Sequence, residues 1–394
     1  MKVIKGAQVY APERLGKKDV LITGSRIYKI ADVIEVPQAL DAEVIDGKNL
    51  ILVPGFIDSH VHVLGGGGEG GFENRMPESA ITDLTMYGIT TAVGLLGTDG
   101  IAREMTSLIA KVKGLKAKGI TAYAYTGSYQ TPICTLTGNV TKDIMMVEEI
   151  IGIGEIAISD HRSSQPSFDE FVQLAAHTRL GGILSGKAGI VELHLGDGSR
   201  CLELLERAIA ETEIPITQFL PTHINRNPRL FEKALEFAKK GGTLDFTGNE
   251  DADYWEKQCG EVRCSKGIRR MLEEGISSDL FTISSDAQGS IPLFSPEGKF
   301  LGTGMGKSSS LLKEIKECIA AETIPMEIAL KAVTSNVARI LCLNTKGHIK
   351  EGYDADLLLL TENMEIHTVI AMGNTMVFNG EPLVKEVFER GSRD

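Results

Sequence analysis

Eight short apolar segments, each followed by a segment of helical periodicity, constrain the fold of this chain more than any other feature. The apolar segments lie at residues 56–62, 90–96, 121–126, 153–160, 189–196, 216–223, 243–248 and 280–286. Intervening segments such as 201–211, 228–240 and 262–274 have the spacing of amphipathic helices. Eight strands alternating with helices predict an α/β fold, a (β/α)8 TIM barrel. A doubly wound open sheet would need a glycine-rich dinucleotide turn after an early strand, and we find none.

The two ends of the chain have a different pattern, that of short β-strands. Apolar runs split by turn residues fill the first 50 residues, and similar runs at 356–360, 367–371 and 375–378 alternate with hairpin-type turns. Neither end has enough strands for a stable sandwich alone, so we expect the two to pack together. The sequence therefore predicts a small β-sandwich domain from residues 1–53 and 346–394, and a barrel domain from residues 54–345.

Composition excludes several classes of partner. The formal net charge of −12 over 394 residues argues against nucleic acid or an anionic membrane as the main partner. No stretch approaches the ~20 apolar residues that span a bilayer, and residues 1–16 lack the apolar core of a signal peptide. Six scattered cysteines in a chain of this size are expected to be reduced, which predicts a cytoplasmic protein.

The sharpest local signal for chemistry is the pair His60 and His62, at the end of the first predicted barrel strand. Residues two apart on a strand face the same side, so both imidazoles can bind one cation. A lone His-x-His is weak evidence, because core or surface histidines explain it more simply. Whether this pair indicates a metal site depends on the residues at the ends of the later strands.

Three later predicted strands end in polar residues, at His194, His223 and Asp286. Each terminates an apolar run, where a buried strand has no packing reason to carry a polar side chain. The carboxyl ends of barrel strands share one face, where barrel enzymes place their active sites. Imidazole and carboxylate are ligands of zinc and similar divalent ions. We therefore expect these three residues to join His60 and His62 in a metal site.

In these features the sequence resembles the amidohydrolase superfamily, and within it the isoaspartyl (β-aspartyl) dipeptidases. The superfamily pattern is His-x-His after the first strand, a bridging carboxylate on the fourth, histidines on the fifth and sixth, and aspartate after the eighth. The segment at residues 347–357 is similar to the segment with which chains of this family pass from the barrel back into the β-domain. Segments 95–100, 125–129, 158–163 and 221–227 resemble isoaspartyl dipeptidases in particular. The resemblance covers essentially the whole chain and implies two divalent metal ions, zinc by default.

The chain departs from that pattern at one metal ligand. Isoaspartyl dipeptidases usually carry a lysine on the fourth strand, carbamylated to bridge the metals, and the matching position here is Glu155. No lysine lies within that predicted strand. A glutamate supplies two anionic oxygens on a shorter arm, so the resemblance implies that Glu155 bridges the metals directly. The alternative is that Glu155 is a surface residue and that one metal binds.

The loops at the predicted barrel mouth indicate the substrate. Glu69 is the single carboxylate in a glycine-rich loop after the first strand, and it can hold a substrate ammonium. That loop lacks the Lys-Ser/Thr of a phosphate-binding P-loop. Arg162 and Arg226 follow the fourth and sixth strands, and guanidinium groups bind carboxylates bidentately. A dipeptide with two free carboxylates and one ammonium needs two such arginines and one such glutamate. By resemblance, the remaining substrate contacts come from Ser290, Thr98 and Gly67.

The predicted reaction is hydrolysis of the β-aspartyl peptide bond of a dipeptide. A hydroxide that bridges the two metals attacks the side-chain amide carbonyl, and Tyr129 donates a hydrogen bond as negative charge develops. Asp286 acts as general base and then as general acid towards the leaving amine. His161 is expected to be structural or to support a neighbouring ligand.

Two other functions remain open at this point. A dihydroorotase- or hydantoinase-like enzyme acting on cyclic amides need not hold a free ammonium, so Glu69 discriminates between the two kinds of enzyme. A non-catalytic scaffold of the same fold would lose metal ligands, whereas here only the lysine is replaced. The resemblance also implies a homo-oligomer, with an octamer built from dimers as one form.

Overall fold

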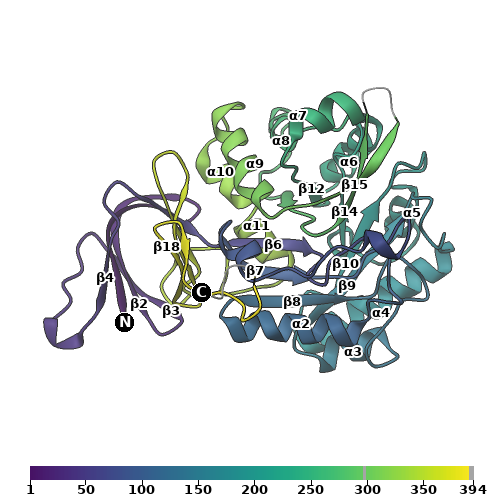
Figure 1. Ribbon diagram of the computed structural model, residues 1–394. Coiled ribbons are helices and arrows are strands. Elements are labelled where there is room, and N and C mark those ends of the chain that lie inside the picture. Colours follow the sequence, from purple (N-terminus) through teal and green to yellow (C-terminus); the bar gives the residue numbers. More distant parts are fainter. Residues whose placement is uncertain (296–298, 390–394) are drawn as a thin grey trace.

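The computed structural model describes residues 1–295 and 299–389, and strands from both ends of the chain lie side by side in it (Figure 1). They form one nine-stranded sheet in the order β19-β18-β17-β16-β5-β1-β2-β3, with β4 paired to β1. The strands are β1 (Lys2–Tyr10), β2 (Arg14–Thr23), β3 (Arg26–Ala31), β4 (Glu43–Asp46), β5 (Ile51–Pro54), β16 (Leu357–Leu360), β17 (Ile366–Ala371), β18 (Asn374–Phe378) and β19 (Glu381–Pro382).

The two ends meet where β5 and β16 pair antiparallel, with Leu52 opposite Leu359. Both of these leucines are buried in an apolar cluster that also takes side chains from β1, β2 and β3. The predicted β-domain built from both termini is therefore confirmed. The domain limits at residues 53 and 346 stay a prediction.

Between the two ends, all eight predicted barrel strands are present and run parallel. They are β6 (Phe56–Val61), β7 (Ile89–Gly94), β8 (Thr121–Thr126), β9 (Ile150–Ile158), β10 (Ile190–Leu195), β11 (Phe219–Thr222), β12 (Leu244–Thr247) and β13 (Phe281–Ser284). Strands β6 to β11 pair in sequence as one sheet, and β12 pairs with β13. A parallel bridge from Val61 to Ala287 closes one seam, and a 2.7 Å hydrogen bond from Thr222 Oγ1 to Asp245 Oδ2 closes the other. The barrel prediction is confirmed.

Helices cover the outside of this barrel (Figure 1). The longer ones are α2 (Met105–Lys118), α4 (Phe168–Ser185), α5 (Glu203–Glu211), α6 (Pro228–Lys239), α8 (Cys264–Glu273) and α9 (Ser309–Ala320). Shorter ones are α1 (Thr82–Thr85), α3 (Val140–Met146), α7 (Ala252–Tyr254), α10 (Met326–Lys331), α11 (Ser335–Ile340) and η1 to η4 (Gln38–Leu40, Phe72–Asn74, Ile216–Gln218 and Trp255–Cys259). Local signals set their starts: Ser167 and Glu170 form a capping box at α4, and Asn227 caps α6 ahead of Pro228. No helix within the described ranges is long and apolar enough to cross a bilayer.

The antiparallel hairpin of β14 (Ser290–Phe294) and β15 (Phe300–Met305) was not predicted. Pro292, Gly302 and Gly304 interrupt the alternation that would have identified these strands. The hairpin extends away from the barrel in Figure 1. It matters for the site because β14 begins at Ser290, four residues after Asp286.

Lys346 stabilises the connection between the barrel and the returning β-strands. Its ammonium lies 2.5 Å from Asp356 Oδ2 and 3.0 Å from Asp354 Oδ2, and the side chains of all three are buried. The substitution Lys346→Met would leave two buried carboxylates without this cation. We expect it to lower the free energy of unfolding by about 3–5 kcal/mol, measured by urea denaturation.

The matched control is Lys316→Met, which removes an exposed ion pair with Glu365. It should change the free energy of unfolding by no more than about 1 kcal/mol. Equal effects of the two substitutions would contradict a stabilising role for the buried cluster.

Candidate metal centre and substrate cavity

Six side chains converge at the carboxyl ends of the barrel strands. They are His60 on β6, His62 just after it, Glu155 on β9, His194 on β10, His223 after β11 and Asp286 after β13. Their ligand atoms form three overlapping groups: His60, His62 and Glu155; His60, His223 and Asp286; and Glu155, His194 and His223. Glu155 is only 1% exposed, so the alternative that it is a surface residue is wrong.

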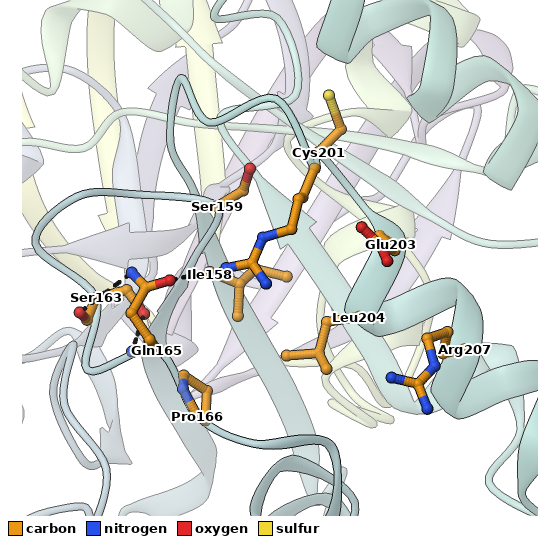
Figure 2. Close-up of a pocket in the computed structure, with 10 residues that line it drawn as sticks. Ile158, Ser159, Ser163, Gln165, Pro166, Cys201, Glu203, Leu204 and Arg207 are labelled. Carbon is orange, nitrogen blue, oxygen red and sulfur yellow. Dashed lines mark hydrogen bonds between the residues drawn. The ribbon is translucent and has the colours of Figure 1, made fainter.

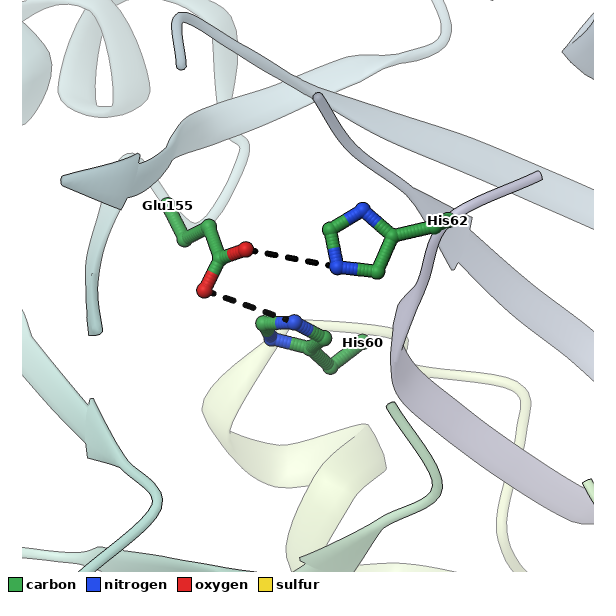
Figure 3. Close-up of side chains that lie close together, drawn as sticks. All are labelled: His60, His62 and Glu155. Atoms are coloured by element: carbon green, nitrogen blue, oxygen red, sulfur yellow. Dashed lines mark ion pairs between the residues drawn. The ribbon is translucent and has the colours of Figure 1, made fainter. Parts of the chain in front are cut away.

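The carboxylate of Glu155 stands between the histidines. Its Oε1 lies 3.3 Å from His62 Nε2, and its Oε2 lies 3.5 Å from His60 Nε2 (Figure 3). On the other side, Oε2 lies 3.0 Å from His194 Nδ1 and 3.5 Å from His223 Nε2. Asp286 closes the cluster, because its Oδ1 lies 3.1 Å from His62 Nε2 and 3.5 Å from His60 Nε2.

Backbone conformation at the strand ends aims two of these side chains. His223 has a φ of 60° and Asp286 a φ of 48°. Side chains other than glycine rarely adopt this left-handed region, and such strain, about 1–3 kcal/mol per residue, is concentrated at functional sites. Asp286 also depends on a close approach by Gly289, where a Cβ atom would lie 2.2 Å from Asp286 Oδ1. The local sequence therefore keeps space for this carboxylate.

Three polar groups hold the histidine nitrogens that face away from the cluster. His60 Nδ1 lies 2.6 Å from Glu192 Oε1, His194 Nε2 lies 3.0 Å from Asp160 Oδ2, and His223 Nδ1 lies 2.5 Å from Thr247 Oγ1. Such outer contacts fix the ring orientation of metal-binding histidines. Sequence reasoning missed all three partners. Two signals were present: Asp160 ends a predicted strand, and Glu192 shares a strand face with His194.

The cluster has the properties of a site for divalent cations. His60 Nε2 and Asp286 Oδ1 are buried and have no hydrogen-bond partner among the described residues. Burial lowers the pKa of His62, but its close contacts with the Asp286 and Glu155 carboxylates and their negative charge raise it to about 9. The centre therefore attracts positive charge. Because four imidazoles and two carboxylates suit zinc and similar ions, the residues fit a metal centre.

A cavity of about 600 Å³, called the substrate cavity here, opens onto this cluster. All seven residues predicted to contact substrate line it: Gly67, Glu69, Thr98, Tyr129, Arg162, Arg226 and Ser290. His62, His194 and Asp286 contribute to the same wall. His161 also lines the cavity, as an exposed side chain. Tyr129 is buried, and its hydroxyl lies 2.8 Å from His194 Nδ1.

Glu69 is the centre of a hydrogen-bond network in this cavity. Its Oε1 accepts hydrogen bonds from Thr98 Oγ1 at 2.7 Å, Arg162 Nη1 at 3.2 Å and Ser290 Oγ at 3.2 Å. Its Oε2 is buried and has no partner among the described residues. Burial raises the pKa of this carboxyl, but hydrogen bonds and the charge of Arg162 bring it below its ordinary value. Glu69 is thus an anion with one oxygen that lacks a hydrogen-bond partner within the described residues.

The two predicted arginines differ in what they contact. Arg162 forms a bidentate pair with Asp160, with Nε 3.1 Å from Oδ1 and Nη2 2.9 Å from Oδ2, in addition to its contact with Glu69. Arg226 makes no side-chain hydrogen bond within the described part of the chain, and its Nε is buried. Arg226 is therefore the arginine better placed to bind an added anion.

The loop after β9, which carries Asp160 and Arg162, is braced from its other side. Gln165 Nε2 donates to the Asp160 carbonyl at 2.8 Å, and Gln165 Oε1 accepts from Arg200 Nη2 at 2.8 Å. These contacts lie at a separate small cavity of about 60 Å³, where Ser163 also bonds to Gln165 (Figure 2). The bracing keeps Arg162 aimed at the substrate cavity.

Comparison with known proteins identifies close relatives. A sequence profile described as the amidohydrolase family matches residues 256–376. The β-aspartyl dipeptidase of Fervidobacterium islandicum AW-1, solved in complex with β-Asp-Leu, is 43% identical with a TM-score of 0.89, covering 97% of this chain and 98% of that one.

More distant relatives share only the fold with this chain, or are similar to it over a short segment. The dihydropyrimidinase of Brevibacillus agri NCHU1002 has a TM-score of 0.69 at 18% identity over 97% of this chain and 96% of its own. A dihydroorotase of Staphylococcus aureus (strain MRSA252) is 42% identical over 69 residues, which are 18% of this chain and 16% of that enzyme. The present chain therefore matches less than a fifth of that enzyme's length.

The contact between His60 and Glu192 predicts a measurable effect on metal binding. The substitution Glu192→Gln keeps the side-chain size but removes the negative charge that orients His60. We expect the affinity for zinc to fall about 10- to 100-fold, measured by competition with a chromophoric chelator. Glu203→Gln, at an exposed position at the start of α5, should bind zinc as the unmodified protein does. Unchanged affinity in Glu192→Gln would mean that Glu192 does not support the metal centre.

Proposed function

Because this chain belongs to the β-aspartyl dipeptidase family of amidohydrolases, we propose that it hydrolyses the β-aspartyl peptide bond of dipeptides. The chain is a hydrolase with the amidohydrolase fold, and the proposal concerns its substrate and the roles of its residues. One observation carries it: Glu69 and Arg226, which keep an oxygen and a guanidinium without hydrogen-bond partners among the described residues, line the cavity that opens onto the candidate metal ligands.

This cavity complements the charges of a β-aspartyl dipeptide. Such a molecule has one α-ammonium on its aspartyl residue and two free carboxylates. Glu69 Oε2 would accept a hydrogen bond from the ammonium, and Arg226 would donate to a carboxylate; charge-assisted bonds of both kinds are the strong ones. Arg162 lines the same cavity and adds a second positive charge, while Ser290 and Thr98 keep Glu69 oriented.

The metal centre would supply the nucleophile. Bound divalent ions act as Lewis acids and lower the pKa of water towards neutrality. The residues that would hold them are His60, His62, His194, His223 and Asp286, with Glu155 shared between two sites. Support for that sharing comes from the two oxygens of Glu155, which face different histidines. The ligand chemistry favours zinc.

Two side chains would handle protons and charge at the scissile amide. Asp286 lines the cavity next to the cluster, so its carboxylate would take the proton of the attacking water and return it to the leaving amine. Tyr129 lines the same wall, and its hydroxyl would donate a hydrogen bond to the carbonyl oxygen as negative charge develops. Asp286 and Tyr129 come from different strand ends, so a rigid barrel sets their separation.

Hydrolysis of cyclic amides, as in dihydroorotases, is the second candidate. A 42% identical segment in one dihydroorotase favours it, but that segment is short. A cyclic amide such as dihydroorotate has no ammonium to bind at Glu69. Glu69 Oε2 would then stay without a hydrogen-bond partner in the enzyme–substrate complex, which costs free energy.

A comparison of four compounds tests the proposal. The zinc-loaded protein should cleave β-Asp-Leu. It should cleave α-Asp-Leu about 100-fold or more slowly in kcat/KM, because the scissile carbonyl is displaced from the reacting groups. N-acetyl-β-Asp-Leu, in which the ammonium is blocked, should lose about tenfold or more in kcat/KM because Glu69 Oε2 is left without a partner. Dihydroorotate should not be hydrolysed.

Two results would contradict parts of this proposal. Turnover of dihydroorotate in place of β-Asp-Leu would assign the site to cyclic amides. Equal turnover of the acetylated and free β-Asp-Leu would show that Glu69 does not bind the ammonium, while leaving the reaction itself in place.

A further inference from the structure

A second cavity opens from the substrate cavity beside Asp286. It has a volume of about 250 Å³ and is called the side cavity here. Both cavities have Asp197, Arg226, Asp286, Ser290 and Pro292 in their walls, so they are continuous where the scissile bond would lie. Glu69, Thr98 and Arg162 line the substrate cavity alone. The proposed contacts to the aspartyl ammonium therefore leave the side cavity unused.

The two flanks of the side cavity differ in polarity. One flank is largely apolar, with Trp255 and Cys259 from η4 and Ile291 and Pro292 from β14. The other flank is polar and includes Asn225, Asn249 and Glu261. A ligand group that fills this space would therefore need both an apolar stretch and a polar end.

Glu261 is held in a fixed orientation on the polar flank. Its Oε1 accepts hydrogen bonds from Asn225 Nδ2 at 2.8 Å and from Asn249 Nδ2 at 2.6 Å. Asn225 is itself oriented, because its Oδ1 accepts a hydrogen bond from Thr247 N at 2.9 Å. Glu261 Oε2 receives no hydrogen bond from the residues that the structure describes. This oxygen is the one available to a ligand.

The environment of Glu261 also lacks a direct counter-charge. Burial raises the pKa of this carboxyl to about 8, although the charge of Arg226 acts in the opposite direction. No lysine or arginine in the described ranges forms an ion pair with Glu261, in contrast to Glu69 and Asp160. A cation entering the side cavity would supply the missing partner, and its charge would favour the ionised form of the carboxyl.

We propose that the side cavity binds the side chain of the leaving residue and that Glu261 selects a basic one, lysine above all. The inference rests on the proposed function and names its preferred substrate class, β-aspartyl dipeptides with a basic second residue. The aspartyl half extends from Asp286 towards Glu69, so the leaving half needs another direction, which the side cavity provides. The methylene stem of lysine would lie along Trp255 and Ile291, and its ammonium would reach Glu261 Oε2.

The test compares β-Asp-Lys with β-Asp-norleucine, which has the same four-carbon stem but no ammonium. The zinc-loaded protein should show a kcat/KM ratio of about ten or more in favour of lysine, the effect of one charge-assisted hydrogen bond. In Glu261→Gln the ratio should fall towards one, because the amide can accept a hydrogen bond but has no negative charge to pair with the ammonium. Glu236→Gln, an exposed position on α6, is the matched control and should keep the original ratio.

A second variant keeps the test decisive if Glu261→Gln is poorly folded. Trp255→Ala would remove the apolar flank, so kcat/KM for both β-Asp-Lys and β-Asp-norleucine should fall relative to β-Asp-Gly, which has no side chain to place. A lysine-to-norleucine ratio near one in the unmodified protein, a ratio unchanged in Glu261→Gln, or unchanged relative rates in Trp255→Ala would overturn the inference. Cleavage of β-Asp-norleucine in those cases would leave the proposed function standing. Failure to cleave any β-aspartyl dipeptide would overturn both.

Discussion

A buried carboxylate among four imidazoles is the interaction on which the site depends. Burial raises the pKa of Glu155, but positive charge at His60 and His194 and hydrogen bonds from His194 and His223 hold it well below its ordinary range. A charge of this kind is tolerated away from water only when it is paired. The barrel satisfies this requirement by bringing ligands from five strand ends to one point. Glu155 therefore joins the two halves of the candidate metal centre.

The same network extends from the candidate metal ligands to the groups that would bind substrate. Asp160 contacts His194 Nε2 on one side and the guanidinium of Arg162 on the other. Arg162 in turn contacts Glu69, the proposed ammonium ligand. The orientation of the candidate metal ligand His194 and that of the proposed ammonium ligand Glu69 are thus set by one series of charged contacts. This arrangement explains how Glu69 and His194 can both be held in fixed orientations although Glu69 does not contact the candidate metal ligands.

Much of the fold could be predicted from the sequence because hydrophobic periodicity reports burial directly. The eight barrel strands and most of the terminal strands carry an apolar run, and the six proposed ligands lie at or near strand ends in the structure. The β14–β15 hairpin could not be found this way, since proline and glycine break its alternation. Glu192 and Asp160 were missed as partners of His60 and His194 because their pairing joins different strands. The side cavity depends on Glu261 and β14 approaching each other, which no local pattern encodes.

The position of metal ions relative to Glu155 tests the central claim most directly. Crystals of the zinc-loaded protein would be measured at the zinc absorption edge, where anomalous scattering locates each ion. We expect two peaks about 3.5–4 Å apart, each within bonding distance of a different Glu155 oxygen. One of them should lie near His60 and His62 and the other near His194 and His223. A single peak, or a Glu155 side chain turned away from both ions, would contradict the account of Glu155 as the shared ligand.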